Sequence, residues 1–238
     1  QAYEAVEQGA LAVLLTYGEA DATAEAQAPP QVIVRAAKPK HGRVGIALVG
    51  AGNFARAVHI PNLKSSRFFD VRAVVSGSAS AAQVARKVGA GLATTDLNAA
   101  LADESVDAVL ISTRHHLHAE QGIAAARAGR HVFVEKPLAL TVPDCEAMIA
   151  AAEEAGVLLT VGFNRRLAPT ALALQEALAA LGGQKTVIFR VNAGALPASH
   201  WLNNPAEGGG RLLGEGVHFI DFVCGMLGAD PLTVSAQG

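Results

Sequence analysis

A glycine-rich turn near residue 50 has the residue types needed to hold a phosphate group. The run from Val44 to Val49 is almost entirely apolar, which is typical of a strand buried on both faces of a parallel sheet. Gly50 permits a tight strand-to-helix turn, and Gly52 lacks the Cβ that would keep a pyrophosphate from the backbone. A helix that starts there offers free N–H groups and a partial positive charge. Although such glycines also serve ordinary turns, we predict a dinucleotide site formed by Gly50, Gly52, Asn53 and Phe54.

A lysine at the end of a second predicted strand has the chemistry to act on a substrate. Glu135, Lys136 and Pro137 directly follow the apolar run from His131 to Val134. Ligands of open α/β sheets bind outside the carboxyl ends of the strands, so we expect Glu135 and Lys136 to lie beside a nicotinamide. The alternative is a turn with two solvated charges. Pro137 argues against it, because proline fixes the turn and can adopt a cis peptide bond that pins the lysine.

The end of the strand predicted over residues 71–75 bears on the choice of cofactor. An Asp or Glu at this place would accept a hydrogen bond from the adenosine ribose and repel a 2′-phosphate. The sequence has Ser76, Gly77 and Ser78 instead, and Arg86 or Lys87 could lie within reach of a phosphate. We therefore expect NAD or NADP, with NADP tolerated or preferred.

Three histidines, His115, His116 and His118, follow the strand predicted over residues 107–111. Their spacing suggests a metal site at first sight. However, no acidic or cysteine residue lies nearby at the spacing of metal ligands, so we expect no metal there.

The elements that position these residues alternate between strand and helix from Val44 onward. We predict strands over 71–75, 107–111, 131–134 and 157–161 and helices over 53–61, 79–88, 118–128 and 143–155. This alternation is typical of a doubly wound parallel sheet of the α/β class. After Gly162 the pattern changes to a helix over 168–181, a strand over 186–191, a mostly helical stretch over 208–227 and the start of a strand over 232–236.

These patterns predict four parts of the chain. Residues 1–17 read as a short helix and strand, similar to the tail of a medium-chain zinc-type alcohol dehydrogenase domain lying upstream. Residues 18–43 have the composition of a linker, with a short edge strand over 31–35. We expect a dinucleotide-binding domain over 44–163 and the start of a truncated substrate domain over 164–238.

Composition limits the classes of partner. The 238 residues are 51% hydrophobic and 17% charged, which is typical of a soluble globular protein. The formal net charge is −2 and the pI about 6.5, so neither nucleic acid nor a membrane surface is an expected partner. The apolar run near the start is too short to span a bilayer. Cys145 and Cys224 are expected to be reduced thiols in a cytoplasmic protein.

Taken in order, five motifs resemble those of the Gfo/Idh/MocA family of NAD(P)-dependent oxidoreductases. They occupy residues 49–55, 112–118, 135–137, 162–166 and 208–221. The resemblance implies a Rossmann domain followed by an α/β domain with an open, mostly antiparallel sheet. It also implies hydride transfer at a hydroxyl-bearing carbon of a sugar, polyol or sugar derivative. Carried over by position, the resemblance makes Lys136 the active-site lysine and His218 the catalytic histidine. It also implies that Arg165 contacts the substrate. The nicotinamide pocket would be lined by Thr113, His115 and His118.

The sequence departs from the family pattern at Gly214, where an aspartate usually precedes the histidine by four residues. In a helix, residues three or four apart share a face, so Glu215 could reach His218 and replace the missing carboxylate. Asp221 could orient the imidazole instead, and Glu215 could be a solvated charge. A second departure is Arg114 and His115, which stand where the family usually has proline and asparagine.

We therefore expect an NAD(P)-dependent oxidoreductase that acts on a carbohydrate-like alcohol or ketone. A non-catalytic dinucleotide-sensing regulator, or a scaffold module of a fused dehydrogenase, is the alternative. The predicted substrate-domain strands have open edges, which suggests a homo-oligomer that forms through that sheet. Because few such strands are present, we expect this length of chain to bind cofactor without appreciable turnover.

Overall fold

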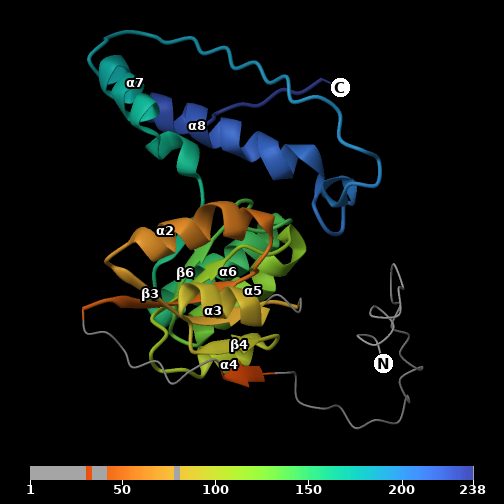
Figure 1. The fold of residues 1–238 in the computed structure, drawn as a ribbon. Coiled ribbons are helices and arrows are strands. Elements are labelled where there is room, and N and C mark those ends of the chain that lie inside the picture. The colour runs from red at the N-terminus through yellow and green to blue at the C-terminus, as the bar shows by residue number, and fades with distance from the viewer. Residues whose placement is uncertain (1–30, 34–41, 78–80, 238) are drawn as a thin grey trace, which may run out of the picture.

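A single mixed sheet forms the centre of the protein. The computed structural model describes residues 31–33, 42–77 and 81–237 (Figure 1). The seven strands lie in the order β1-β4-β3-β2-β5-β6-β7, and all neighbours are parallel except the antiparallel edge pair β1 and β4. The strands are β1 (Gln31–Ile33), β2 (Val44–Val49), β3 (Phe69–Val75), β4 (Leu92–Thr94), β5 (Ala108–Ile111), β6 (His131–Val134) and β7 (Leu159–Val161). This doubly wound α/β arrangement confirms the predicted fold of the first domain.

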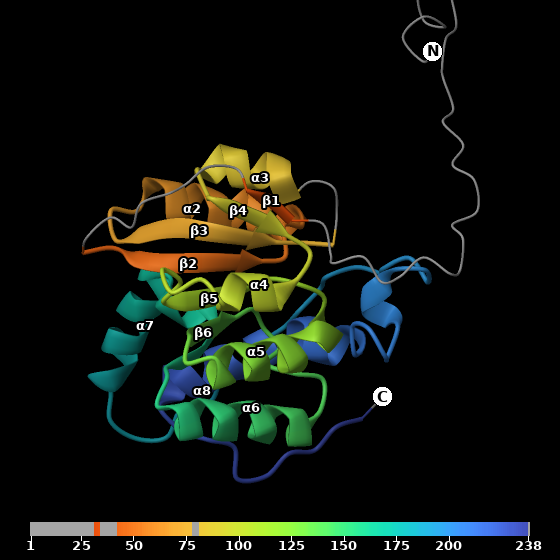
Figure 2. The ribbon, with the colours of Figure 1, turned by 90° about the horizontal axis from the view of Figure 1, so that it is seen from below.

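Helices cover both faces of the sheet (Figure 2). One face packs against α2 (Ile60–Ser65) and α3 (Ala81–Val88), and the other against α4 (Leu97–Leu101), α5 (His118–Arg127) and α6 (Val142–Ala155). Successive side chains of a strand point to opposite faces, so β2 contributes to both cores. Ile46 and Leu48 pack with α2 and α3, whereas Ala47 and Val49 pack with the helices of the other face. This two-sided burial explains the continuous apolar run of β2.

Local signals in the sequence fix the ends of the helices. Helix α6 begins after Thr141, whose hydroxyl accepts a hydrogen bond from the backbone N–H of Asp144 at 3.2 Å, and it ends at Gly156 in the left-handed conformation with φ 65°.

None of the helices in the described part of the chain is long and apolar enough to cross a membrane.

Several boundaries differ from the sequence predictions. The predicted edge strand at residues 31–35 is confirmed over 31–33, but β4 and α4 were not predicted. These two elements have only three and five residues, which is too short for a periodic pattern to be visible. The predictions for residues 1–30, for Ser78 and for most of the linker lie outside the described residues.

The chain beyond β7 forms a separate helical layer (Figure 1). It contains the 3-10 turns η3 (Asn164–Leu167) and η4 (Trp201–Asn203), the helix α7 (Pro169–Ala179), the π turn η5 (Leu212–Gly216) and the helix α8 (Val217–Leu227). Helices α7 and α8 pack on each other, and the Gln175 amide donates a hydrogen bond to the carbonyl of Gly225 at 2.9 Å. The predicted helices in this region are therefore confirmed.

The strands predicted over 186–191 and 232–236 are wrong for this structure. Both segments are irregular and pair with no other strand in the described part of the chain. A β-branched sequence does not form a strand without a neighbour to complete its hydrogen bonds. Several of their apolar side chains are exposed to solvent, with Ile188 86% and Val234 84% exposed.

Candidate functional site

A groove runs along the carboxyl ends of β2, β3 and β5. Its volume is about 670 Å³. The described residues that line it are Val49, Gly50, Ala51, Gly52, Asn53, Phe54, Val75, Ser76, Gly77, Thr95, Ser112, Thr113, Arg114, Leu117, Gln121 and Trp201. This is the edge of an open α/β sheet at which ligands bind.

The glycine turn at the end of β2 has the geometry that a bound phosphate requires. Gly50 has φ 91°, and a Cβ there would lie 2.5 Å from the carbonyl oxygen of Ser112, so only glycine fits. A Cβ on Gly52 would meet nothing within 4 Å, because the groove is open beside it. The helical segment that follows runs from Asn53 through the π turn η1 (Ala55–His59) into α2. The turn therefore fits a dinucleotide: it leaves room for the pyrophosphate beside Gly52 at the start of a helix.

The adenosine end of the groove contains no carboxylate among its described lining residues. Ser76 and Gly77 follow β3 and lie in the groove as predicted, whereas Ser78 is outside the described residues. The charged side chain among the described lining residues is Arg114, which lies three residues after β5.

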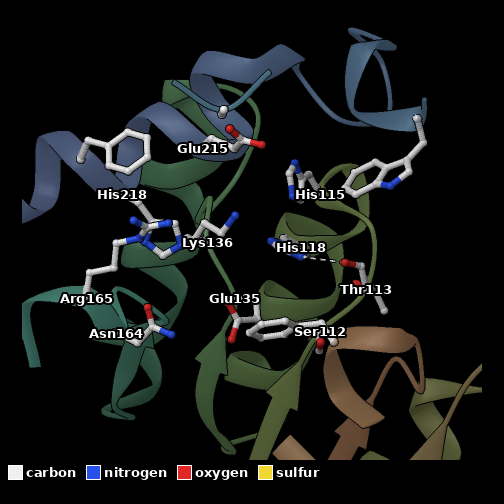
Figure 3. A pocket seen from close by; sticks show the side chains of 14 residues that line it. Ser112, Thr113, His115, His118, Glu135, Lys136, Asn164, Arg165, Glu215 and His218 are labelled. Carbon is white, nitrogen blue, oxygen red and sulfur yellow. Dashed lines mark hydrogen bonds between the residues drawn. The ribbon is translucent and has the colours of Figure 1, made fainter. Parts of the chain in front are cut away.

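A second cavity of about 750 Å³ opens from the same edge of the sheet (Figure 3). It shares Phe54, Ser112, Thr113 and Trp201 with the groove. Its other lining residues are His115, His118, Glu135, Lys136, Asn164, Arg165, Ala193, Glu215, His218 and Phe219. The shared residues make the groove and the cavity continuous. All the described residues predicted for the site therefore line one or the other.

Lys136 lies at the end of β6 and points into the cavity (Figure 3). The peptide bond between Lys136 and Pro137 is cis. The lysine Nζ donates a hydrogen bond to the backbone carbonyl of Gly214 at 2.5 Å. Burial lowers the pKa of Lys136 from its usual value, while the negative charges of Glu135 and Glu215 oppose this change. The lysine therefore contacts the residue at which the sequence departs from the family pattern.

His218 enters the cavity from the first turn of α8. Its ring is buried, it meets the edge of Phe163 with ring centroids 6.1 Å apart, and its Nδ1 has no hydrogen-bond partner among the described residues. Burial lowers the pKa of His218, and the positive charges of Lys136 and Arg165 lower it further. The imidazole is consequently neutral at pH 7 and able to accept a proton.

Glu215 lines the cavity but does not contact His218 as the sequence suggested. Its carboxylate forms an ion pair with Arg211 at 3.1 Å. Arg211 lies four residues earlier, at the start of η5, and takes the carboxylate as an i,i+4 partner. Asp221 does not orient the imidazole either, because it binds the guanidinium of Arg166.

His118 is fully buried and braces the turn that holds Lys136. Its Nδ1 lies 2.7 Å from the carbonyl oxygen of Pro137, and its Nε2 lies 3.3 Å from that of Thr113. Burial lowers the pKa of His118 more than these two acceptors raise it. No group of three potential metal ligands is formed by the described residues. The geometry gives His118 a role in holding the two strand ends together.

The two unusual residues after β5 hold the segment around Trp201. Arg114 pairs with Glu207 at 2.6 Å, and its guanidinium lies 4.7 Å from the centroid of the Trp201 ring. His115 Nδ1 lies 2.8 Å from the carbonyl oxygen of Gly208. Burial lowers the pKa of His115 to about 4. These contacts place Trp201 over the junction of the groove and the cavity.

The lining residues that the sequence analysis did not assign to the site include Ser112, Asn164, Trp201 and Phe219. Ser112 follows a buried strand, so the rule that ligands bind at carboxyl ends could have found it. Trp201 lies in a segment without periodicity, and its place depends on contacts with residues about 87 positions earlier in the chain, such as Arg114. No sequence signal could have found it.

Comparison with known proteins supports this description. Residues 44–163 match the sequence model of an oxidoreductase family with an NAD-binding Rossmann fold, GFO_IDH_MocA. The chain is 35% identical over 188 residues to the 1,5-anhydro-D-fructose reductase of Ensifer adhaerens, and the match covers 77% of the chain and 56% of the reductase. The chain thus spans about half the length of the curated relatives it matches.

Two solved structures are similar over most of the chain. A 3-ketoreductase from Actinomadura kijaniata, in complex with NADP and TDP-benzene, has a TM-score of 0.67 and 27% identity, covering 78% of this chain and 57% of that one. A levoglucosan dehydrogenase in complex with NADH and levoglucosan has a TM-score of 0.65 and 27% identity, covering 77% and 54%. With the family match over the whole Rossmann domain, these likenesses show that the chain belongs to the Gfo/Idh/MocA family of oxidoreductases.

Proposed function

We propose that this chain is part of an NAD(P)-dependent oxidoreductase that moves a hydride to or from a sugar, a polyol or a sugar derivative. The observation behind the proposal is that Lys136 and His218 line one cavity, which is continuous with a groove suited to a dinucleotide. The names of the similar proteins, an anhydrofructose reductase and a levoglucosan dehydrogenase, support a carbohydrate-like substrate.

The described residues divide the work between binding and proton transfer. Gly50, Gly52, Asn53 and Phe54 would hold the pyrophosphate half of the cofactor, and Thr113, His115 and His118 would frame its nicotinamide end. The bound nicotinamide supplies or accepts the hydride. The Lys136 ammonium polarises the substrate oxygen. The neutral His218 imidazole takes the hydroxyl proton during oxidation, and the protonated ring returns a proton during reduction. Arg165, whose guanidinium lies 4.7 Å from the Phe219 ring centroid, would hold a substrate hydroxyl at the cavity wall.

The adenosine end of the groove can accommodate the ribose of NAD or the 2′-phosphorylated ribose of NADP. Since no described lining residue is acidic, nothing there repels a 2′-phosphate. We expect NADPH to bind at least as well as NADH. Isothermal titration calorimetry of the full chain with each cofactor measures this preference, and about a hundredfold preference for NADH, near 3 kcal/mol, would contradict it.

The test of the dinucleotide site is the variant Gly52→Val. Its branched side chain would fill the open space beside the turn, so calorimetry should show that NAD(P)H binding is abolished. Gly182→Val is the matched control, because a Cβ there also meets nothing within 4 Å but lies away from the groove. Unchanged affinity in Gly52→Val would show that the cofactor does not bind here.

The test of hydride transfer is turnover with a panel of sugars and polyols, followed by NAD(P)H absorbance. The full-length protein should turn over at least one of them, and Lys136→Met should reduce that activity more than about a hundredfold while cofactor affinity changes little. Cofactor binding without turnover of any member of the panel would favour a dinucleotide-sensing role.

We also propose the larger organisation that the sequence suggests. Residues 164–238 would begin a substrate domain with an open, mostly antiparallel sheet, and the exposed apolar side chains of 186–191 and 232–236 support this. The same sheet would form a homo-oligomer in a cytoplasmic protein, and residues 1–17 would end an alcohol dehydrogenase-like domain. Analytical ultracentrifugation of the full-length protein at several concentrations tests the oligomer.

A further inference from the structure

The two carboxylates among the described lining residues of the cavity each have a partner within the chain. Glu215 forms an ion pair with Arg211 at 3.1 Å. The Oε1 of Glu135 lies 2.8 Å from the Nε2 of His59, and both residues are buried. The protein's own negative charges are therefore already engaged, and the cavity presents little of them to a ligand.

Two cations of the cavity lack such a partner. Lys136 and Arg165 both extend into it (Figure 3). The lysine Nζ donates a hydrogen bond to a neutral acceptor, the backbone carbonyl of Gly214, at 2.5 Å. The guanidinium of Arg165 lies 4.7 Å from the centroid of the Phe219 ring. Within the described part of the chain, neither cation forms an ion pair with a carboxylate.

The next arginine along the chain shows the contrast. Arg166 binds the carboxylate of Asp221, with its Nε 2.9 Å from Oδ2, whereas Arg165 lines the cavity. A guanidinium that lies over an aromatic ring keeps its N–H donors at the edge of its plane. Arg165 is thus supported by Phe219 while its donors remain available to a ligand.

The wall of the cavity beside Lys136 has no room for another side chain of the protein. A Cβ added at Gly214 would overlap the side chain of Leu202, which is buried. A carboxylate could stand there only if Leu202 moved. The fold thus keeps this wall uncharged, and two cations facing one cavity attract a negatively charged ligand.

We propose that the substrate is a sugar acid, and that Arg165 binds its carboxylate while Lys136 acts on the oxygen of the reacting alcohol or ketone. Arginine suits this task because two of its N–H groups can donate to both carboxylate oxygens in parallel. The inference rests on the proposed function and narrows it, since the group that meets Arg165 becomes a negatively charged one in place of a neutral hydroxyl.

Matched ligand pairs test the charge of the ligand. D-Glucuronate and D-glucose, D-galacturonate and D-galactose, and D-gluconate and D-glucitol each differ by a carboxylate in place of a hydroxymethyl group. Isothermal titration calorimetry of the full-length protein, with and without NADPH, measures their binding without the need for turnover. At least one acid should bind more than about tenfold more tightly than its neutral partner. No preference for the acid in any pair would overturn the inference.

Two arginine variants locate the carboxylate. Arg165→Met and Arg190→Met each remove one guanidinium and keep an unbranched apolar stem, but Arg190 is exposed and does not line the cavity. Arg165→Met should abolish the preference for the acid, and Arg190→Met should retain it in full. An undiminished preference in Arg165→Met would overturn the assignment. If that variant does not fold, Arg165→Lys replaces it: losing the two-point contact should weaken binding of the acid several-fold and leave binding of the neutral partner unchanged.

The inference and the proposed function can fail separately. If a neutral sugar is turned over with a kcat/KM equal to that of its acid, the function holds and the inference is overturned. If an acid binds through Arg165 but none is turned over, the carboxylate site stands and the hydride-transfer function fails. Where an acid is turned over, Arg165→Met should raise its KM much more than it lowers kcat, because a binding contact is lost.

Discussion

The buried histidine His115, which lines the cavity next to Trp201, should make the protein sensitive to mild acid. His115 has a pKa of about 4 in the folded protein, against 6.5 when it is exposed, chiefly because burial disfavours the charged ring. The folded-state pKa is lowered, so between these two values the unfolded chain binds more protons than the folded one. Stability is therefore lost as pH falls from 6.5 toward 4. Proton linkage gives a loss of about 2 kcal/mol from this side chain between pH 7 and pH 5.

The assay is urea denaturation at pH 7 and pH 5 for the wild type and for His115→Asn. Asparagine retains an N–H donor for the carbonyl of Gly208 and does not titrate. The buried His118 and His218 contribute to the pH dependence of both proteins, so the difference between the two isolates His115. The wild type should lose about 2 kcal/mol more than the variant over this range.

The exposed neighbour His116 provides the control. His116→Asn makes the same substitution at an exposed position of the same loop, so it controls for effects of the substitution other than the loss of the buried ring. Equal losses of stability in the wild type and His115→Asn would show that the imidazole is not desolvated as the structure places it, and the contact with Gly208 would then be wrong.

Three further predictions follow from the site. Gly50→Ala should lower the melting temperature by several degrees, because residue 50 has φ 91° and the alanine Cβ would meet backbone atoms. Gly52→Ala should leave the melting temperature nearly unchanged, because a Cβ there meets nothing within 4 Å. Lys136→Met should reduce kcat/KM of the full-length enzyme more than about a hundredfold, with NAD(P)H affinity by calorimetry within a few-fold of wild type. Arg114→Met removes the cation over Trp201, the single tryptophan, so acrylamide should quench its fluorescence more strongly; unchanged quenching would mean that the segment is held by other contacts.

Much of the Rossmann domain could be predicted from the sequence, because its signals are local. Val44–Val49 is apolar throughout since a parallel strand is buried on both faces, and Gly50 follows since the turn needs a positive φ. Lys136 could be placed in the site from its position at the end of a strand, because the carboxyl ends of parallel strands meet at one edge. These inferences need only neighbouring residues and the rules of one sheet.

The tertiary structure decided the features that depend on distant parts of the chain. The contact of Lys136 with the carbonyl of Gly214 joins residues 78 positions apart, so no local pattern predicts it. His59 and Glu135 form a pair although they lie 76 positions apart in the sequence. The residues around His59 give no indication that Glu135 is its partner, and those around Glu135 give none for His59. The same limit explains the two predicted strands over 186–191 and 232–236. Their composition favours β-structure, but a strand forms only where another strand lies beside it to complete the hydrogen bonds.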